Sequence, residues 1–205
     1  MFGRMTLPRS DWYEATELSG DHVKLVALRE EHAAGVLDAS DDDEVFRWQS
    51  FARPGSIEEA EALIDLYLGR SDTVAWAQVD QASNEIAGLT TYYDIDPDQR
   101  TVAIGSTWLA RRFWRTGVNT EAKLLLMRHA FDTLDCARVV WHVDILNERS
   151  QAAVERIGGV REGVLRKHRI RRDGSWRDTV LYSMTDDEWP AARSDLERRL
   201  AQPAF

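Results

Sequence analysis

The sequence VAIGSTWLARRFWRTGVNT spans Val102 to Thr120. Its first part, up to Leu109, has the β-branched and aromatic residues of a strand, and an apolar helix begins near Val118. The turn between them, Arg111 to Gly117, follows the strand, holds three arginines and ends in a glycine. Such a turn exposes the first backbone N–H groups of the helix, which carry partial positive charge. The stretch therefore predicts a phosphate-binding turn, although an arginine-rich turn without a ligand has the same pattern.

Apolar periodicity on both sides of this turn predicts a chain in which strands and helices alternate. The helix at 118–134 is apolar around most of its circumference, which indicates burial against a sheet. No repeat or linker divides the sequence, so we expect a flexible N-terminal extension (1–17) and a single α/β domain (18–205). The other predicted strands are 22–28, 73–79, 86–93, 138–145, 164–170 and 179–184, and the other helices are 30–39, 56–68, 150–157 and 187–200.

Composition restricts the class of protein. The chain has 205 residues, a formal net charge of -9 and one cysteine, Cys136, so an intrachain disulfide and a multi-cysteine zinc site are excluded. No apolar run is long enough for a transmembrane helix, and we expect a cytoplasmic protein without a membrane partner. Residues 1–100 hold 21 acidic and 8 basic side chains, and residues 101–205 hold 14 and 18. The asymmetry suits a protein that binds both an anion and a cation, or it reflects unequal solvated faces.

Several motifs, in this order, resemble the GNAT acyltransferase superfamily. They are the turn Arg112-x-x-Arg115-x-Gly117, the segment Val118 to Lys123, and the segments Leu146 to Ser150 and Glu162 to Arg166. The last two are similar to the RimJ/RimL branch, whose members acetylate the N-termini of ribosomal proteins. The resemblance implies a mixed, mainly antiparallel central sheet flanked by helices. It also implies that the turn cradles the pyrophosphate of acetyl-CoA.

The resemblance assigns a set of residues to the coenzyme and no metal to the protein. One departure is Arg115, which stands where the family has the first glycine of its turn. A second is Val154, where many members have a tyrosine that protonates the leaving thiolate. The residues expected to bind acetyl-CoA are Leu109, Arg112, Arg115, Thr116, Gly117, Val118, Asn119, Thr120, Asn147 and Ser150.

Acyl transfer to an amine needs an oxyanion donor, a partner for the leaving thiolate and a neutral amine. The family supplies the oxyanion donor from a backbone N–H, here within 107–109. Ser150 is the candidate near the sulfur and Asn147 its hydrogen-bonding neighbour, while either residue could instead cap a helix. For the general base the sequence offers Glu121, Asp144 and His142. Glu121 could equally stabilise the start of its own helix, and a strand histidine is often structural.

The resulting hypothesis is an acetyl-CoA-dependent N-acetyltransferase that acts on a primary amine by direct attack in a ternary complex. The acceptor is a protein N-terminus or a small molecule, and a homodimer is an expectation from the family alone. The acidic run Asp41 to Glu44, followed by Trp48 and Phe51, could receive a cationic amine or be a solvated loop. The alternative is a non-catalytic acyl-CoA-binding module. A nucleic-acid partner for the basic stretch Arg166 to Arg172 is not expected.

Overall fold

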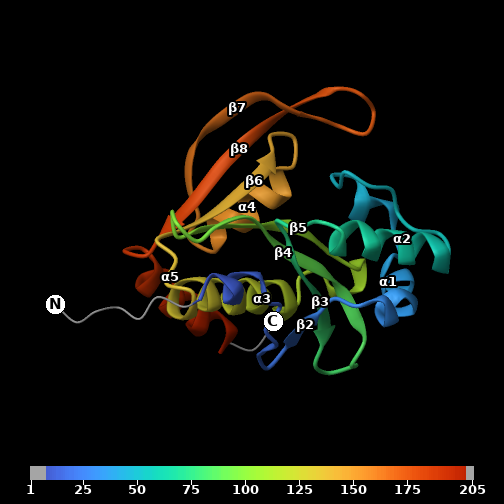
Figure 1. The fold of residues 1–205 in the computed structure, drawn as a ribbon, viewed down its shortest axis with the longest axis horizontal. Coiled ribbons are helices and arrows are strands. Elements are labelled where there is room, and N and C mark those ends of the chain that lie inside the picture. The colour runs from blue at the N-terminus through green and yellow to red at the C-terminus, as the bar shows by residue number, and fades with distance from the viewer. Residues whose placement is uncertain (1–7, 202–205) are drawn as a thin grey trace.

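The computed structural model describes residues 8–201, and these residues form one sheet with helices on both faces (Figure 1). The strand order is β1-β2-β3-β4-β5-β6-β8-β7, and every neighbouring pair is antiparallel except β5 and β6. The strands are β1 (Leu18–Ser19), β2 (Val23–Ala27), β3 (Val74–Asp80), β4 (Ile86–Asp96), β5 (Thr101–Leu109), β6 (Arg138–Asp144), β7 (Val160–Ile170) and β8 (Trp176–Thr185). The α-helices are α1 (Ala33–Ala39), α2 (Ile57–Leu68), α3 (Gly117–Arg128), α4 (Glu148–Arg156) and α5 (Trp189–Leu200). The predicted mixed, mainly antiparallel sheet is confirmed.

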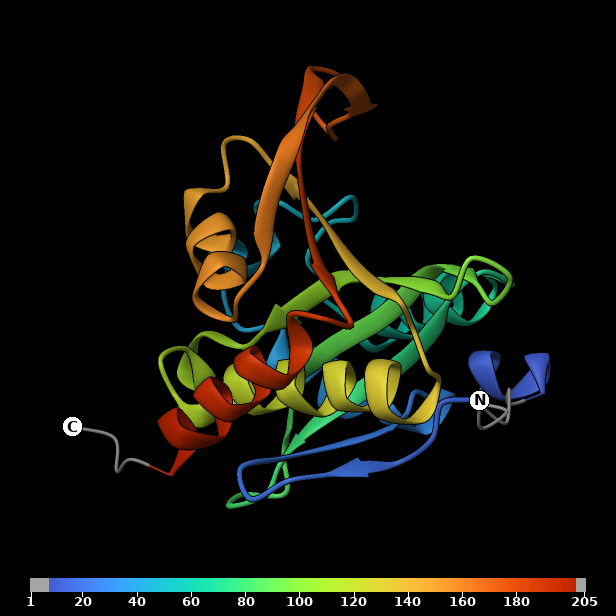
Figure 2. The ribbon, with the colours of Figure 1, turned by 90° about the vertical axis from the view of Figure 1, so that its left-hand side faces the viewer.

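Helices α3 and α5 lie against one face of the sheet, and α1 and α2 cover the other (Figure 2). The seven residues from Glu121 to Met127 are all buried, as the apolar pattern predicted. The α-helix ends at Arg128 instead of 134, and a wider π-type turn, His129–Thr133, follows it. Within residues 8–201, every helix is too short or too polar to span a lipid bilayer.

Local sequence signals set several element ends. Ser56 accepts a hydrogen bond from the Glu59 N–H (3.3 Å) and so caps α2. The Glu59 carboxylate accepts from the Gly55 N–H (2.6 Å), one residue before the position that a capping box would use. After α4, Gly158 adopts a left-handed φ of 96°, which permits the predicted stop.

The N-terminal segment belongs to the packed domain from residue 9 onward. A short 3-10 helix, Arg9–Tyr13, buries the Trp12 side chain, and the Trp76 indole donates to the Thr16 carbonyl (2.9 Å). Within the stretch 1–17 that was expected to be a flexible extension, the buried Trp12 side chain thus anchors the segment and offsets part of the entropy of ordering it. Residues 1–7 lie outside the described part.

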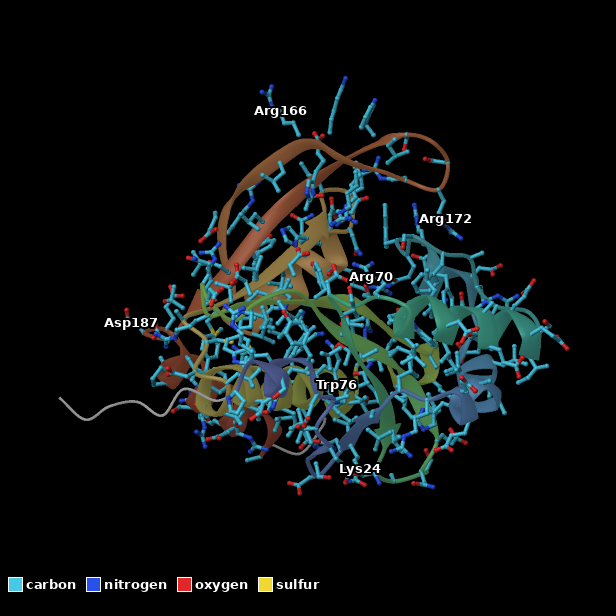
Figure 3. The ribbon with its side chains drawn as sticks, in the orientation of Figure 1. Lys24, Arg70, Trp76, Arg166, Arg172 and Asp187 are labelled. Carbon is cyan, nitrogen blue, oxygen red and sulfur yellow. The ribbon has the colours of Figure 1, made fainter. Side chains whose placement is uncertain are left out.

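The β7–β8 hairpin rises from the sheet and arches back over its centre (Figure 1). Arg171 near its tip pairs with Asp144 at the end of β6. Arg172 points toward the connection between α1 and α2, where it donates to the Phe46 carbonyl (3.3 Å; Figure 3). The end of β6 and the α1–α2 connection thereby hold the hairpin over the region where β5 and β6 end.

Candidate active site

The parallel strands β5 and β6 pair over only three residues and then separate. Their register runs from Thr101 opposite Arg138 to Ala103 opposite Val140. Beyond this point β5 continues to Leu109 and β6 to Asp144 without pairing to each other. The backbone of residues 104–109 is therefore left without a strand partner on the β6 side.

A bulge in β5 lies within this unpaired stretch. Thr91 is opposite Gly105 and Leu89 is opposite Trp108, so Thr90 alone faces two residues of β5. Ser106 in the bulge has a left-handed φ of 45°, and its carbonyl accepts from the Tyr67 hydroxyl (3.0 Å). The Thr107 carbonyl accepts from the Gln49 side-chain amide (3.1 Å). Side chains on the α1–α2 side therefore fix the backbone where the oxyanion donor is predicted.

The predicted phosphate-binding turn forms the start of α3. Thr116 is the N-cap: its hydroxyl accepts from the Val118 N–H (3.3 Å) and donates to the Phe113 carbonyl (2.8 Å). The N–H groups of Gly117 and Asn119 have no hydrogen-bond partner among residues 8–201. The helix start thus keeps the unpaired donors and the positive dipole end that a phosphate requires.

Gly117 serves a contact that the sequence did not suggest. A β-carbon on Gly117 would lie 2.6 Å from Cδ2 of the His22 ring. The glycine therefore lets the imidazole of the β1–β2 turn pack directly on the first residue of α3. Within the described residues, the group that lies against this glycine is the His22 ring.

Arg115 has a left-handed φ of 61° at the position of the family's first glycine. Its backbone therefore lies outside the regions that a residue with a side chain ordinarily adopts. The turn needs this conformation to bring the chain from the 3-10 helix Arg111–Phe113 into α3, and a side chain with a β-carbon is strained there. The Arg115 side chain is exposed and makes no ion pair among residues 8–201.

Relief of this strain should be measurable. We expect Arg115→Gly to unfold with a free energy about 0.5–1 kcal/mol higher than that of Arg115→Ala. Both variants lose the guanidinium, so they differ only in the backbone preference at one residue. Urea unfolding without coenzyme measures the difference, and equal stabilities would contradict the strain. Affinity for acetyl-CoA in the same pair shows separately what the charge contributes.

Arg112 and its neighbour Arg111 both form ion pairs with carboxylates. The Arg112 guanidinium pairs with Asp38 (2.7 Å), Asp41 (3.1 Å) and Glu85 (3.4 Å). Arg111 pairs with Asp42 (2.7 Å). The structure therefore directs Arg112, a predicted coenzyme ligand, toward α1 and the β3–β4 turn.

The same ion pairs neutralise the acidic run that was expected to receive a cationic amine. Asp43 pairs with Arg53 (2.7 Å) and Glu44 with Arg47 (3.6 Å). Phe51 packs against Tyr67. The loop is thus internally compensated and offers no free cluster of carboxylates to a cation.

Glu121 binds a turn instead of acting as a base. Its side chain is buried and accepts three backbone N–H groups, from Asp21 (2.8 Å), His22 (2.6 Å) and Val23 (2.8 Å). These donors belong to the β1–β2 turn, so the carboxylate joins that turn to α3. The Glu121 carboxylate is thus engaged with the turn, and it neither caps its own helix nor stands free as a proton acceptor.

Asn147 and Ser150 begin α4 on the other side of the separated strands. The Asn147 side-chain oxygen accepts from the Ser150 N–H (3.1 Å), so Asn147 is the N-cap. The half-buried Ser150 hydroxyl has no hydrogen-bond partner among residues 8–201. Of the two structural alternatives, capping therefore applies to Asn147, and the Ser150 hydroxyl is left for another role.

One contact joins the two sides of the opening between β5 and β6. The Arg149 guanidinium on α4 lies 3.8 Å from the centroid of the Trp114 ring in the turn before α3. The Trp114 indole N–H donates to the Leu109 carbonyl (2.8 Å), which fixes the ring. The predicted phosphate-binding turn and the predicted sulfur-binding helix thus touch directly.

Asp144 is held in a buried ion pair. Its carboxylate accepts from Arg171 Nε (2.7 Å) and Nη2 (2.9 Å) and from the Leu146 N–H (2.9 Å). Burial acts to raise the pKa of Asp144, but these hydrogen bonds and the charges of Arg171 and Arg177 hold the pKa below its ordinary value. A carboxylate bound in this way is a poor proton acceptor.

His142 is the third candidate base, and it has a partner that the sequence did not reveal. The Tyr93 hydroxyl lies 2.9 Å from His142 Nδ1, and the His168 ring lies 5.7 Å away, centroid to centroid. Burial is the main cause that lowers the pKa of His142, so its imidazole is neutral at neutral pH. Gly105 permits this arrangement, because a β-carbon there would lie 2.6 Å from the Tyr93 ring. Strand alternation could have placed Tyr93 on this face, but its pairing with β6 residues depends on the sheet order.

Three comparisons with known proteins agree on the family. A family model described as "Acetyltransferase (GNAT) domain" matches residues 22–160. The crystal structure of a GCN5-related N-acetyltransferase from Brucella melitensis is 31% identical and matches with a TM-score of 0.88 over 92% of this chain and 86% of that chain. "Putative ribosomal N-acetyltransferase YdaF" from Bacillus subtilis (strain 168) is 34% identical over 51% of this chain, and the chain spans only 56% of its length. Mycobacterium smegmatis RimJ in complex with CoA-disulfide shares the fold: 21% identity, TM-score 0.74, covering 86% of this chain and 88% of that chain.

Proposed function

Because this chain belongs to the GNAT acetyltransferase family, with relatives that support the RimJ/RimL-like branch, we propose that it transfers the acetyl group of acetyl-CoA to a primary amine by direct attack. The observation that carries the proposal is the separation of β5 from β6. This opening is bordered by the unpaired N–H groups at the start of α3 and by the free hydroxyl of Ser150. We place the CoA portion of acetyl-CoA along this opening; the RimJ structure that shares the fold was solved in complex with CoA-disulfide.

The residues present fit the coenzyme without a metal-binding cluster. The start of α3, with Gly117 and Asn119, would hold the pyrophosphate through backbone N–H groups. The β5 backbone at 107–109, on the side that has no pairing with β6, would hold the thioester carbonyl and its oxyanion. Among residues 8–201 there is no group of three or more metal-binding side chains.

The chemistry then needs two proton movements. The amine nitrogen attacks the thioester carbonyl carbon, the C–N bond forms, the nitrogen loses a proton and the C–S bond breaks. When His142 Nδ1 donates to the Tyr93 oxygen, Nε2 is free to accept the proton of the amine. The Ser150 hydroxyl would donate to the leaving sulfur, in place of the tyrosine that Val154 replaces. His142 is thus our candidate base, and Glu121 and Asp144 are not.

Coenzyme binding and turnover test this proposal together. A thermal shift with acetyl-CoA at ~100-fold above its dissociation constant should show about 2.7 kcal/mol of added stability. A panel of peptide and small-molecule amines should then release free thiol from acetyl-CoA. The name of the YdaF relative supports protein N-termini as the first acceptors to try. Binding without release of thiol on any amine would favour the non-catalytic acyl-CoA-binding alternative.

Ser150→Ala should lower kcat by about 100-fold with little change in KM for acetyl-CoA. The hydroxyl would act only when the sulfur leaves, so its loss affects the transition state and not the bound ground state. Steady-state kinetics on the best acceptor measure the split. Ser194→Ala on the exposed part of α5 is the matched control. A kcat within twofold of the wild type would remove Ser150 from the mechanism.

A further inference from the structure

Two arginines face each other across the β7–β8 hairpin. Arg169 is the register partner of Arg177, so both side chains lie on the same face of neighbouring strands. Like charges placed directly opposite each other are destabilising. Arg177 is partly compensated by Asp144, whose Oδ2 lies 3.9 Å from its Nε. Arg169 makes no ion pair or hydrogen bond with any side chain of residues 8–201.

This pair lies beside the candidate base. Arg177 Nη2 donates to the His142 carbonyl (2.9 Å), and His142 in turn contacts Tyr93. Burial is the main cause that lowers the pKa of the His142 imidazole; the charge of Asp94 acts to raise this pKa, and the charges of His168, Arg169 and Arg177 act to lower it. The His168 ring completes the cluster. A hollow of about 740 Å³ along the same strand shares His168 and is lined by Val164, Leu165, Arg166, Lys167, His168 and Asp178.

Arg169 is the exposed cation of this cluster that no carboxylate of residues 8–201 pairs with, and an uncompensated positive charge beside the proposed base has two consequences for an acceptor. Positive charge favours the neutral form of an amine, which is the form that attacks the thioester. It also repels the ammonium form in which most amines arrive. An acceptor with a negative group beside its amine would offset that repulsion.

We propose that the acceptor carries a carboxylate close to the amine that is acetylated, and that Arg169 binds this carboxylate. The inference rests on the proposed acetyl transfer and names its substrate class. The planar guanidinium suits a carboxylate, to which it can donate two parallel hydrogen bonds. A free amino acid and a peptide with Asp or Glu at its first or second residue both present this chemistry. The compensated acidic run at Asp41 to Glu44 agrees with it, because that loop offers no competing site for a cationic acceptor.

Matched acceptors test the proposal and distinguish a free amino acid from a peptide with an acidic side chain as the source of the carboxylate. One arm compares peptide amides that differ only at the second residue, as Glu, Gln or Lys. The other arm compares alanine with alaninamide, which lacks the free carboxylate. We expect kcat/KM to be at least 10-fold higher for the carboxylate member in one arm, and that arm identifies the source.

Variants of Arg169 complete the test. Arg169→Gln should abolish the preference, and Arg169→Glu should reverse it toward the lysine peptide. Arg161→Gln, at the other end of the same exposed strand, should keep it. Melting temperatures check that each variant is folded. The melting temperature of Arg169→Gln should equal that of the wild type, because the Arg169 side chain makes no ion pair or hydrogen bond with a side chain of residues 8–201.

The two proposals fail in different ways. Turnover with equal kcat/KM for charged and neutral acceptors, or a preference that survives in Arg169→Gln, overturns this inference and leaves acetyl transfer standing. No thiol release on any acceptor overturns the proposed function itself.

Discussion

Asp144→Asn is expected to lower the free energy of unfolding by about 3–5 kcal/mol. The substitution leaves Arg171 and Arg177 without their carboxylate in a site where the Asp144 side chain is only 5% exposed. It also releases the hairpin tip that Arg171 fixes to the end of β6. Urea unfolding monitored by tryptophan fluorescence measures the loss, with Asp187→Asn on the exposed surface as the control.

The pH dependence of this effect has a definite sign. The folded state holds the pKa of Asp144 below its ordinary value, so its contribution is present above that value and is lost as the pH falls through the folded pKa. The difference between wild type and Asp144→Asn should therefore be constant from pH 5 to 8 and shrink in acid. His142→Gln, in contrast to Asp144→Asn, should abolish activity and change the free energy of unfolding little. A loss of kcat without loss of stability in Asp144→Asn would return Asp144 to the list of bases.

Lys123→Met is expected to raise the free energy of unfolding at pH 7 by about 2–4 kcal/mol. Lys123 is buried on α3, and its Nζ donates only to hydroxyls, of Thr107 (2.6 Å) and Thr90 (3.4 Å). Burial lowers the pKa of Lys123 from 10.5 to about 7, and no carboxylate pairs with it among residues 8–201. Methionine fills a similar volume without a charge, and the two threonine hydroxyls still bond to each other (2.8 Å).

Titration supplies the decisive readout for Lys123. Between about pH 7 and 10.5 the unfolded chain keeps a proton on Lys123 that the folded chain has released, so wild-type stability should rise with pH over this window. The rise should be absent in Lys123→Met. It should be unchanged in Lys24→Met, a substitution at a half-buried position of β2. A wild-type curve that is flat from pH 7 to 10 would contradict the lowered pKa of the buried Lys123 amine.

Local signals explain which parts of the fold the sequence could predict. The caps at Ser56 and Gly158, the apolar circumference of α3 and the turn before it depend on neighbours within a few residues. The left-handed φ of Arg115 is a local feature that the sequence hid, because arginine gives no hint of it. Only the family's glycine at that position pointed to a special conformation.

The roles of the candidate bases depended on contacts between distant residues. Glu121 binds N–H groups about 100 residues away in the sequence, and Asp144 is bound by Arg171 from a hairpin across the sheet. The sequence offered three ionisable residues near the predicted site, Glu121, Asp144 and His142, but their spacing along the chain does not show which of them is free to accept a proton. The pairing order of the sheet decides that Tyr93 meets His142, and this order is not readable from the periodicity of either strand.

The outermost position of β7 also bears on self-association. Within residues 8–201 no further strand pairs with its outer edge, and an open edge of this length is a template on which a second chain can add and begin to polymerise. Charged side chains along β7 and the left-handed bulge residue Lys167 (φ 50°) interrupt that template. Neutralising several of these charges together would leave the already exposed Val160, Leu165 and Ile170 without charged neighbours, on an edge prone to aggregation. The charged residues of this strand thus hinder strand addition at its edge, independently of any ligand that its arginines bind.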